Sequence, residues 1–165
     1  MICAIIAAII ILVYLYLIMP SIGRKEIKMH NLDTKVCTIA NDIMKDYKGL
    51  YCMESFQPLA VRWYRKNRPD IMRGQLSTHF GVEDLRRARF ENPAQWLVHH
   101  LLTNHFCRPD FIAYSYKRPN TVSRNIVRHL YKTPQFTWTI RSQGTMEEVN
   151  KKFDNFIFEQ FIPKV

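Results

Sequence analysis

The chain has 165 residues, and its 24 lysines and arginines against 14 aspartates and glutamates give a formal net charge of +10. This excess favours anionic partners, but no zinc finger, arginine-rich helix or paired RNA-binding aromatic motif accompanies it, so nucleic acid is not an expected partner. The four cysteines form neither a Cys-x-x-Cys pair nor another metal-binding spacing, which predicts reduced, mostly buried thiols rather than a zinc site.

The chain begins with an uncharged, apolar segment. Residues 1–23 carry no charged side chain, and residues 2–19 are almost entirely Ile, Leu, Val, Ala, Tyr and Met. As a helix this stretch reaches about 27 Å, close to the hydrocarbon thickness of a bilayer. A cleaved signal peptide would need a basic start and a small-x-small site, and neither precedes Pro20 and Ser21. We therefore expect an uncleaved transmembrane anchor over residues 1–23.

A basic juxtamembrane segment, residues 24–32, follows this anchor. Arg24, Lys25 and Lys28 lie directly after the apolar stretch, whereas its N-terminal side has no charged side chain. The positive-inside rule then predicts a single-pass protein of the cell membrane whose remaining residues lie in the cytoplasm. Because every charged residue lies beyond the anchor, the membrane and its anionic lipid headgroups are expected partners of the basic excess.

Residues 33–165 alternate between helix-like and strand-like patterns. Apolar residues between 33 and 48 recur at intervals of three and four, which predicts a helix that ends at Gly49. The elements expected after it are a strand over 50–56, a helix from Pro58 to Pro69, a strand over 71–77, a helical region over 82–106 interrupted near Pro93, a strand over 110–116, a helix over 121–131 and a strand over 136–142. Residues 145–161 are expected to begin as a helix, with Val149, Phe153 and Phe156 facing inward. Four such strand and helix units, each about 25 to 40 residues long, are typical of a parallel α/β fold.

The number of units limits the architecture. Parallel strands need cover on both faces or closure into a barrel, and four strands cannot close a barrel alone. An eight-unit barrel typically takes about 250 residues, which is far more than residues 33–165 provide. This region is therefore expected to be either a small open sheet or half of a larger barrel.

Four short motifs occur in a fixed order within residues 33–164. They are Glu-Ser-Phe at 54–56 followed by Pro58, Arg-Gly-Gln-Leu at 73–76, Asp-Phe-Ile-Ala-Tyr at 110–114, and Thr-Trp-Thr-Ile-Arg-Ser at 137–142. In this order and spacing they resemble the motifs of the glycerophosphodiester phosphodiesterase family, whose fold is a (β/α)8 TIM barrel. The resemblance implies that residues 33–165 form a partial barrel, the last four β/α units or about strands 5 to 8, preceded by one transmembrane helix.

The same resemblance implies a function in lipid metabolism. The family hydrolyses glycerophosphodiesters with two histidines as acid and base and with a divalent cation, Mg²⁺ or Ca²⁺, held by carboxylates. The family carries these groups in the first half of its barrel, as His-Arg and Glu-x-Asp pairs among others. Here His30 is followed by Asn31, and no Glu-x-Asp occurs. No catalytic residue or metal ligand is therefore assigned, and this chain alone is not expected to hydrolyse the substrate or to bind the cation.

The resemblance also implies a set of substrate-binding residues near the strand ends. Glu54 would touch substrate or metal, and Ser55 and Phe56 would contact the glycerol side. Gln75 would donate a hydrogen bond, Trp138 would wall the pocket, and Arg141 would meet a phosphate. Structural roles compete with three of these assignments. Glu54 could pair with an arginine, Trp138 could pack in the core, and Arg141 could simply be solvated.

Two side-chain clusters have competing interpretations. The histidines at 99, 100 and 105 lack the His-Glu-x-x-His spacing of a zinc hydrolase, so a zinc site is not expected. Arg86, Arg87 and Arg89, with Phe90 and Trp96 nearby, could rest on anionic lipid or form a solvated helix face.

Three functional hypotheses follow from these observations. The chain could be part of a phosphodiesterase whose missing strands come from another polypeptide. It could be a non-catalytic binding module that forms a homo-oligomer or pairs with a complementing half-barrel, because a missing half leaves two unpaired edges. It could also be a deletion remnant that joins an anchor to the second half of an enzyme.

Overall fold

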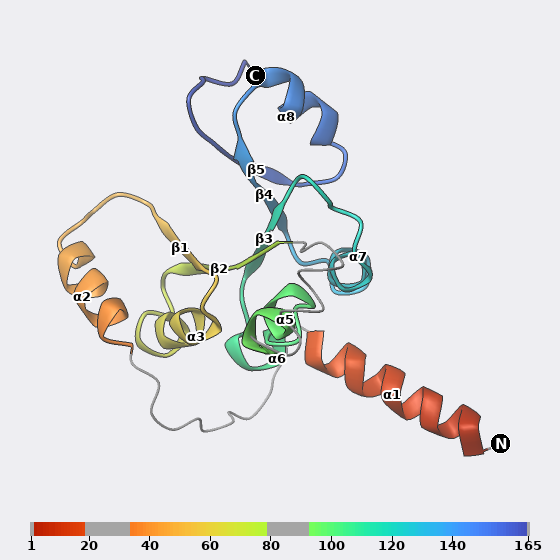
Figure 1. Ribbon diagram of the computed structural model, residues 1–165. Coiled ribbons are helices and arrows are strands. Elements are labelled where there is room, and N and C mark those ends of the chain that lie inside the picture. Colours follow the sequence, from red (N-terminus) through yellow and green to blue (C-terminus); the bar gives the residue numbers. More distant parts are fainter. Residues whose placement is uncertain (1, 19–33, 79–92, 165) are drawn as a thin grey trace.

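A five-stranded parallel sheet organises the molecule. The computed structural model describes residues 2–18, 34–78 and 93–164. Its strands are β1 (Cys52–Ser55), β2 (Met72–Ser77), β3 (Phe111–Ser115), β4 (Gln135–Ile140) and β5 (Asn155–Phe158), and they lie side by side in chain order. All four pairings are parallel, and the sheet curls into a half-barrel (Figure 1). The predicted α/β class and partial barrel are therefore confirmed.

Helices connect the strands. The described helices are α1 (Ile2–Ile18), α2 (Lys35–Met44), α3 (Pro58–Asn67), α5 (Pro93–His99), α6 (Asn104–Cys107), α7 (Val122–His129) and α8 (Gln143–Val149). Pro58 lies in the first turn of α3, as the sequence predicts, because that position needs no main-chain donor. The helix expected over 82–106 is only partly described, since residues 79–92 lie outside the described ranges.

The prediction for residues 145–161 is wrong after α8. This segment was expected to continue as a helix with Phe153 and Phe156 facing inward, but the helix ends at Val149 and Asn155–Phe158 forms β5. Phe153 enters the core from the turn between the two elements and Phe156 packs against it from β5, so both face inward as expected. Alternating aromatic and branched side chains suit a strand once β4 offers an edge to pair with. The half-barrel thus has five strands instead of four.

The helix-facing side of the sheet holds the main core. Ile112, Tyr114 and Ile140 point from β3 and β4 toward the helices. They pack with apolar side chains contributed by the α5–α6 turn, α7, α8 and the segment after α8, namely Leu101, Leu102, Val127, Val149 and Phe153. These residues are all buried, so the outer helices are fixed on the sheet by apolar packing.

The concave side of the sheet is filled by aromatic rings. Phe111 of β3 is buried and stacks on Phe136 of β4 with 4.3 Å between ring centroids. Its ring also covers Gly74 of β2, where an added Cβ would lie 2.2 Å from the ring. Only glycine leaves this space free. The concave side beside Gly74 is therefore filled by the protein's own aromatic rings.

Two aspartates tie together the amino ends of neighbouring strands. Asp110, just before β3, accepts from the Arg73 main-chain N–H (2.9 Å) and returns its own N–H to the Arg73 carbonyl (2.8 Å). Asp154, just before β5, makes the same pair of bonds with Gln135 of β4 (2.8 Å each). Each carboxylate also pairs with an arginine, Arg73 or Arg128. In each case the aspartate adds one more hydrogen-bonded position to the start of a parallel strand pair, β2 with β3 and β4 with β5.

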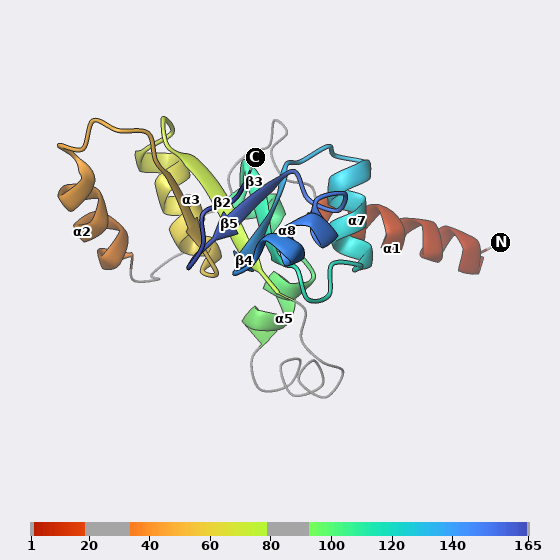
Figure 2. The same ribbon diagram turned by 90° about the horizontal axis from the view of Figure 1, so that it is seen from above.

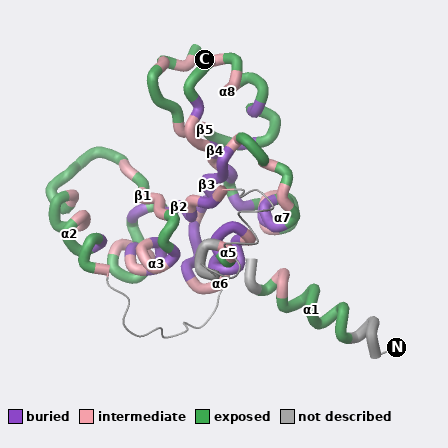
Figure 3. Tube along the Cα trace, in the orientation of Figure 1, coloured by how far each residue is buried: buried purple, intermediate pink, exposed green. Residues whose placement is uncertain are grey.

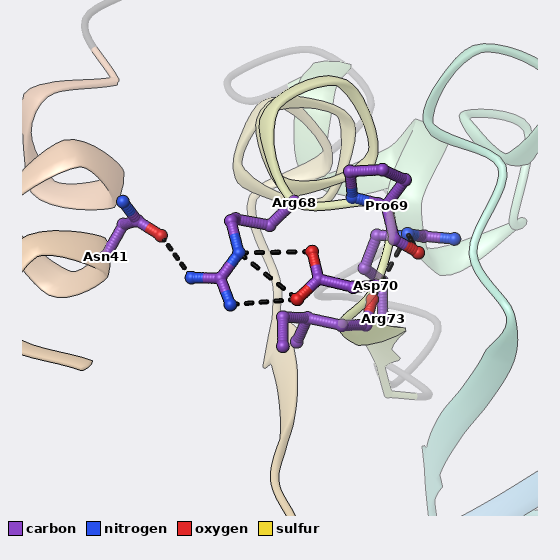
Figure 4. Close-up of polar contacts among 6 residues, drawn as sticks. Asn41, Arg68, Pro69, Asp70 and Arg73 are labelled. Carbon is purple, nitrogen blue, oxygen red and sulfur yellow. Dashed lines mark hydrogen bonds and ion pairs between the residues drawn. The ribbon is translucent and has the colours of Figure 1, made fainter. Parts of the chain in front are cut away.

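The helix α2 does not pack as its sequence pattern predicts. The apolar residues that repeat along it mark one helix face, yet Val36, Ile39 and Ile43 on that face are exposed. The helix docks through the opposite side, where Cys37 is buried and Asn41 accepts a hydrogen bond from Arg68 (2.7 Å, Figure 4). The physical reason is that β1 is the last strand on this side, so the sheet offers nothing for the apolar face to cover.

The cysteines follow the sequence expectation in part. Cys37 and Cys107 are buried free thiols, and burial raises the pKa of Cys107 to about 12. Cys52 of β1 is exposed, contrary to the expectation of mostly buried thiols, because it lies on an edge strand.

The apolar N-terminal segment forms a single helix that extends away from the sheet (Figures 1 and 2). Among the described residues, no helix, including the 17-residue α1, is both long and apolar enough to cross a membrane. The predicted N-terminal helix is confirmed. Its described length falls short of a membrane-spanning helix. Most side chains described in α1 are exposed (Figure 3), but its last turn is docked, since Tyr131 Oη donates to the Leu15 carbonyl (2.6 Å).

The close approach of Phe111 to Gly74 predicts a position-specific loss of stability. We expect Gly74→Ala to lower the free energy of unfolding by about 1–3 kcal/mol, because the new methyl group must displace a ring held by Phe136. Gly144→Ala is the matched control, since nothing lies within 4 Å of an added Cβ there. Urea unfolding followed by circular dichroism measures both, and equal stability of the two variants would contradict the packing.

The aspartate arrangement predicts a second difference. We expect Asp110→Ala to lower the free energy of unfolding by about 2 kcal/mol, because it leaves the Arg73 main-chain N–H and guanidinium without this acceptor. Asp70→Ala removes an exposed ion pair with Arg68 and is expected to cost less than Asp110→Ala, because solvent screens exposed pairs. Thermal unfolding of both variants measures the two losses of stability. A loss in Asp70→Ala equal to or larger than that in Asp110→Ala would contradict the prediction.

Candidate functional site

The curl of the sheet brings the carboxyl ends of β1 and β4 together on the concave side. Phe56 follows β1 and Trp138 lies in β4, with β2 and β3 between them in the sheet. Their rings nevertheless meet edge to face, 5.5 Å between centroids and 88° between planes. Trp138 is held in place by its Nε1–H, which donates to the Ala113 carbonyl (3.1 Å). Phe56 and Trp138 therefore form an aromatic wall at the mouth of the half-barrel, where barrel enzymes carry their sites.

Glu54 is the carboxylate nearest this wall along the chain, two residues before Phe56 in β1. It is half-buried, and its Oε2 is shielded from solvent without a hydrogen-bond partner among the described residues. Burial raises the pKa of Glu54 above its ordinary value. Within residues 34–78 and 93–164, Glu54 forms no ion pair with an arginine, the structural role that the sequence allowed. A shielded carboxylate oxygen of this kind can take up a proton, accept a hydrogen bond or bind a cation.

Ser55 and Gln75 are engaged by the protein itself. Ser55 Oγ accepts from the Gln57 main-chain N–H (3.0 Å) just before α3. Gln75 is fully buried, and its Nε2 donates to the carbonyls of Ser55 (3.0 Å), Phe56 (3.3 Å) and Leu76 (2.9 Å). Gln75 thus fixes the main chain that carries Phe56, and its side chain is not presented to solvent at the strand mouth.

Arg141 follows β4 at the same end of the sheet. It is exposed, and its Nε donates to Glu159 Oε1 at 2.5 Å. Glu159 comes directly after β5, so this ion pair joins the carboxyl ends of the last two strands. An anion that approached Arg141 would compete with this carboxylate.

The histidine cluster is distributed among structural roles. His99 Nδ1 donates to the Thr78 carbonyl (2.6 Å), and His105 Nδ1 donates to the Leu102 carbonyl (2.9 Å). Within the described ranges no group of three His, Cys, Asp or Glu side chains is placed to hold a metal ion. Arg86, Arg87, Arg89 and Phe90 lie outside the described residues, as does the basic segment 24–32.

The alternation of side chains in β1 adds a residue that motif comparison missed. Cys52 and Glu54 are two positions apart, so they lie on the same face of the strand. Partial burial and the Glu54 carboxylate both raise the pKa of the Cys52 thiol. Glu54 therefore disfavours the thiolate form of its neighbour. The sequence already indicated that Cys52 lies beside Glu54, because residues two positions apart in a strand share a face.

Comparison with known proteins gives no significant match, whether to a protein-family model, to a curated protein or to a solved structure. The site is therefore described by its own geometry: one shielded carboxylate, an aromatic wall and a surrounding main chain held by Gln75. Such a set can bind a small polar ligand against the rings. Glu54 supplies one carboxylate ligand, and a divalent cation would need its other ligands from elsewhere, such as a substrate phosphate and water.

The environment of Glu54 predicts a pH-dependent stability difference. Because its pKa is higher in the folded than in the unfolded chain, the ionised side chain destabilises the fold at neutral pH, and this cost disappears as the pH falls below the ordinary glutamate value. We expect Glu54→Gln to raise the melting temperature slightly at pH 7 and to leave it unchanged below about pH 4. Thermal unfolding between pH 4 and 8 measures the difference, and a variant less stable at pH 7 would contradict it.

Proposed function

We propose that the chain is a membrane-associated, glycerophosphodiester phosphodiesterase-like protein that binds glycerophosphodiesters at the mouth of its half-barrel and does not hydrolyse them alone. The observation that carries this proposal is the meeting of Phe56 and Trp138 above the strand ends, close in sequence to the shielded carboxylate of Glu54. Aromatic faces suit the glycerol carbons, and the carboxylate suits a glycerol hydroxyl or a cation that accompanies the phosphate.

Hydrolysis would need groups from a second polypeptide. A divalent cation, Mg²⁺ or Ca²⁺, would supply charge neutralisation at the phosphodiester, and Glu54 fits as one of its ligands. Further carboxylates and the acid and base histidines would have to come from strands that pair with β1 or β5. The chain's own contribution is to position the substrate against the wall and to exclude water from one side of it.

Two alternatives differ from this proposal in what they predict. A non-catalytic module would bind the headgroup or associate with another half-barrel, and a deletion remnant would do neither. The specific observation that favours a binding role over a remnant is that Gln75 and Ala113 hold Phe56 and Trp138 in place from buried positions.

The proposed ligand site predicts saturable binding. We expect calorimetric titration with glycerophosphocholine to give a dissociation constant in the millimolar range, with at least tenfold weaker binding for Phe56→Ala, because the edge of the aromatic wall is lost. Leu130→Ala is the control, since Leu130 is exposed on the segment after α7 and away from the wall. No binding by the wild-type chain would favour the remnant.

Hydrolysis is tested in the same preparation. With Mg²⁺ or Ca²⁺ present, we expect the purified chain to release no glycerol 3-phosphate from glycerophosphocholine. Release that survives Glu54→Gln would show catalytic groups that the proposal does not contain.

Membrane association is the second part of the proposal. The exposed apolar side chains of α1, including Ile9, Ile10 and Leu12, supply the attraction, and the basic excess adds to it on anionic lipid. We expect the full chain to stay with the membrane fraction in alkaline carbonate and to be released by detergent. Release by 1 M salt alone would instead indicate that only charge holds it there.

A further inference from the structure

In the part of the chain that the structure describes, the half-barrel ends in two parallel edges with no further strand beside them. β1 and β5 are the outer strands of the sheet, and all five strands run in the same direction. An unpaired edge leaves main-chain donors and acceptors available to another strand. If β5 of one chain were placed beside β1 of another, the pairing would be parallel, as in the rest of the sheet.

The β1 side carries an apolar face without a strand beneath it. Val36, Ile39 and Ile43 lie on one side of α2 and are 78%, 59% and 74% exposed. The helix is not free to turn this face inward, because Cys37 is buried on its other side. Asn41 on that side is also held by Arg68, which in turn bonds Asp70 (Figure 4). In an α/β fold such a face covers the strand next to the edge, so α2 is positioned to cover a strand that pairs with β1.

The β5 side carries the complementary feature. Phe158 pairs in register with Ile140, so it lies on the helix-facing side of the sheet, where Ile140 is part of the core. Ile140 is buried, whereas Phe158 is 49% exposed. Phe158 therefore has the position of a residue that an outer helix should cover, and its ring meets the Phe161 ring, 5.7 Å between centroids, while staying half exposed.

We infer that two copies of this chain associate head to tail, with β5 of each copy pairing with β1 of the other and with Phe158 covered by the partner's α2. The same contact occurs twice around a twofold axis, so it closes and leaves no free edge. The two arcs together give a ten-stranded parallel barrel, from the five strands of each chain. A second copy is the favoured occupant because this chain itself presents both a strand edge with an uncovered phenylalanine and a helix with an uncovered apolar face.

This association is independent of the proposed ligand. It uses α2, β1 and β5, whereas the ligand wall uses Phe56 and Trp138, so loss of the dimer leaves ligand binding to be measured on its own. A complementing half-barrel would compete with the second copy for the same two edges. The net charge of +10 makes copies repel at low salt, and the association is therefore measured at 0.3 M salt, where repulsion beyond about 6 Å is screened.

Sedimentation equilibrium of the full chain in a density-matched detergent tests the inference. We expect a dimer for the wild type, and at least a tenfold weaker association for Ile43→Glu and for Phe158→Glu. Val122→Glu is the matched control, since Val122 is 71% exposed on α7, away from both edges. A wild-type monomer, or a dimer unaffected by both edge variants, would overturn the inference.

A cross-linking experiment distinguishes this contact from other dimers. Two differently tagged chains are co-expressed in a Cys52→Ser background, one with Ile43→Cys and the other with Phe158→Cys, and are treated with a short bismaleimide. We expect a product that contains both tags, and none when Val122→Cys replaces Ile43→Cys. Equal yields from the two combinations would overturn the head-to-tail arrangement.

Discussion

The contact between the Phe111 ring and Gly74 is the constraint on which the half-barrel depends. A parallel sheet must be covered on both faces, and helices cover only one face here. The other face is concave and narrow, so the protein fills it with two stacked phenylalanines instead of a third layer. The Phe111 ring lies directly over β2, so the strand can carry no side chain at that position. Gly74 of β2 meets this requirement. The curl then brings Phe56 and Trp138 within contact of each other.

The two ends of the sheet are stabilised by different chemistry. At the amino ends, Asp110 and Asp154 join strand pairs through main-chain bonds and arginines. Outside this amino-end arrangement, Arg124 in the first turn of α7 is a buried cation that donates to the Pro119 carbonyl (2.8 Å) and the Lys152 carbonyl and lies 4.1 Å over the Phe153 ring. Burial lowers the pKa of Arg124 to about 10, so it stays charged at neutral pH. At the carboxyl ends, Arg141 pairs with Glu159, and Glu54 has a shielded oxygen without a hydrogen-bond partner in the described part of the chain.

Local patterns in the sequence predicted the first four strands and most helices, because apolar runs bounded by glycine and proline have few alternatives. The last strand was missed because Phe153 and Phe156 also fit a helical period, and only the free edge of β4 decides between the two. The exposed face of α2 could not be foreseen, since periodicity indicates which side is apolar and not whether a strand lies under it. The sequence also could not show which motif residues support the main chain and which keep a side-chain group available. Gln75 and Glu54 both lie in strands, but burial by neighbours determines that one supports the main chain and the other has a shielded, unpaired oxygen.

The bond between Tyr131 and the last turn of α1 has a mechanical consequence. A domain joined to an apolar helix by a loose linker can rotate freely, whereas here the Leu15 carbonyl is held 2.6 Å from Tyr131 and Tyr16 lies beside His105. Helix and half-barrel therefore turn as one body. With α1 embedded in lipid as proposed, the tilt of the helix would set the direction in which Phe56 and Trp138 face, and the mouth would meet its ligands at one fixed angle to the bilayer.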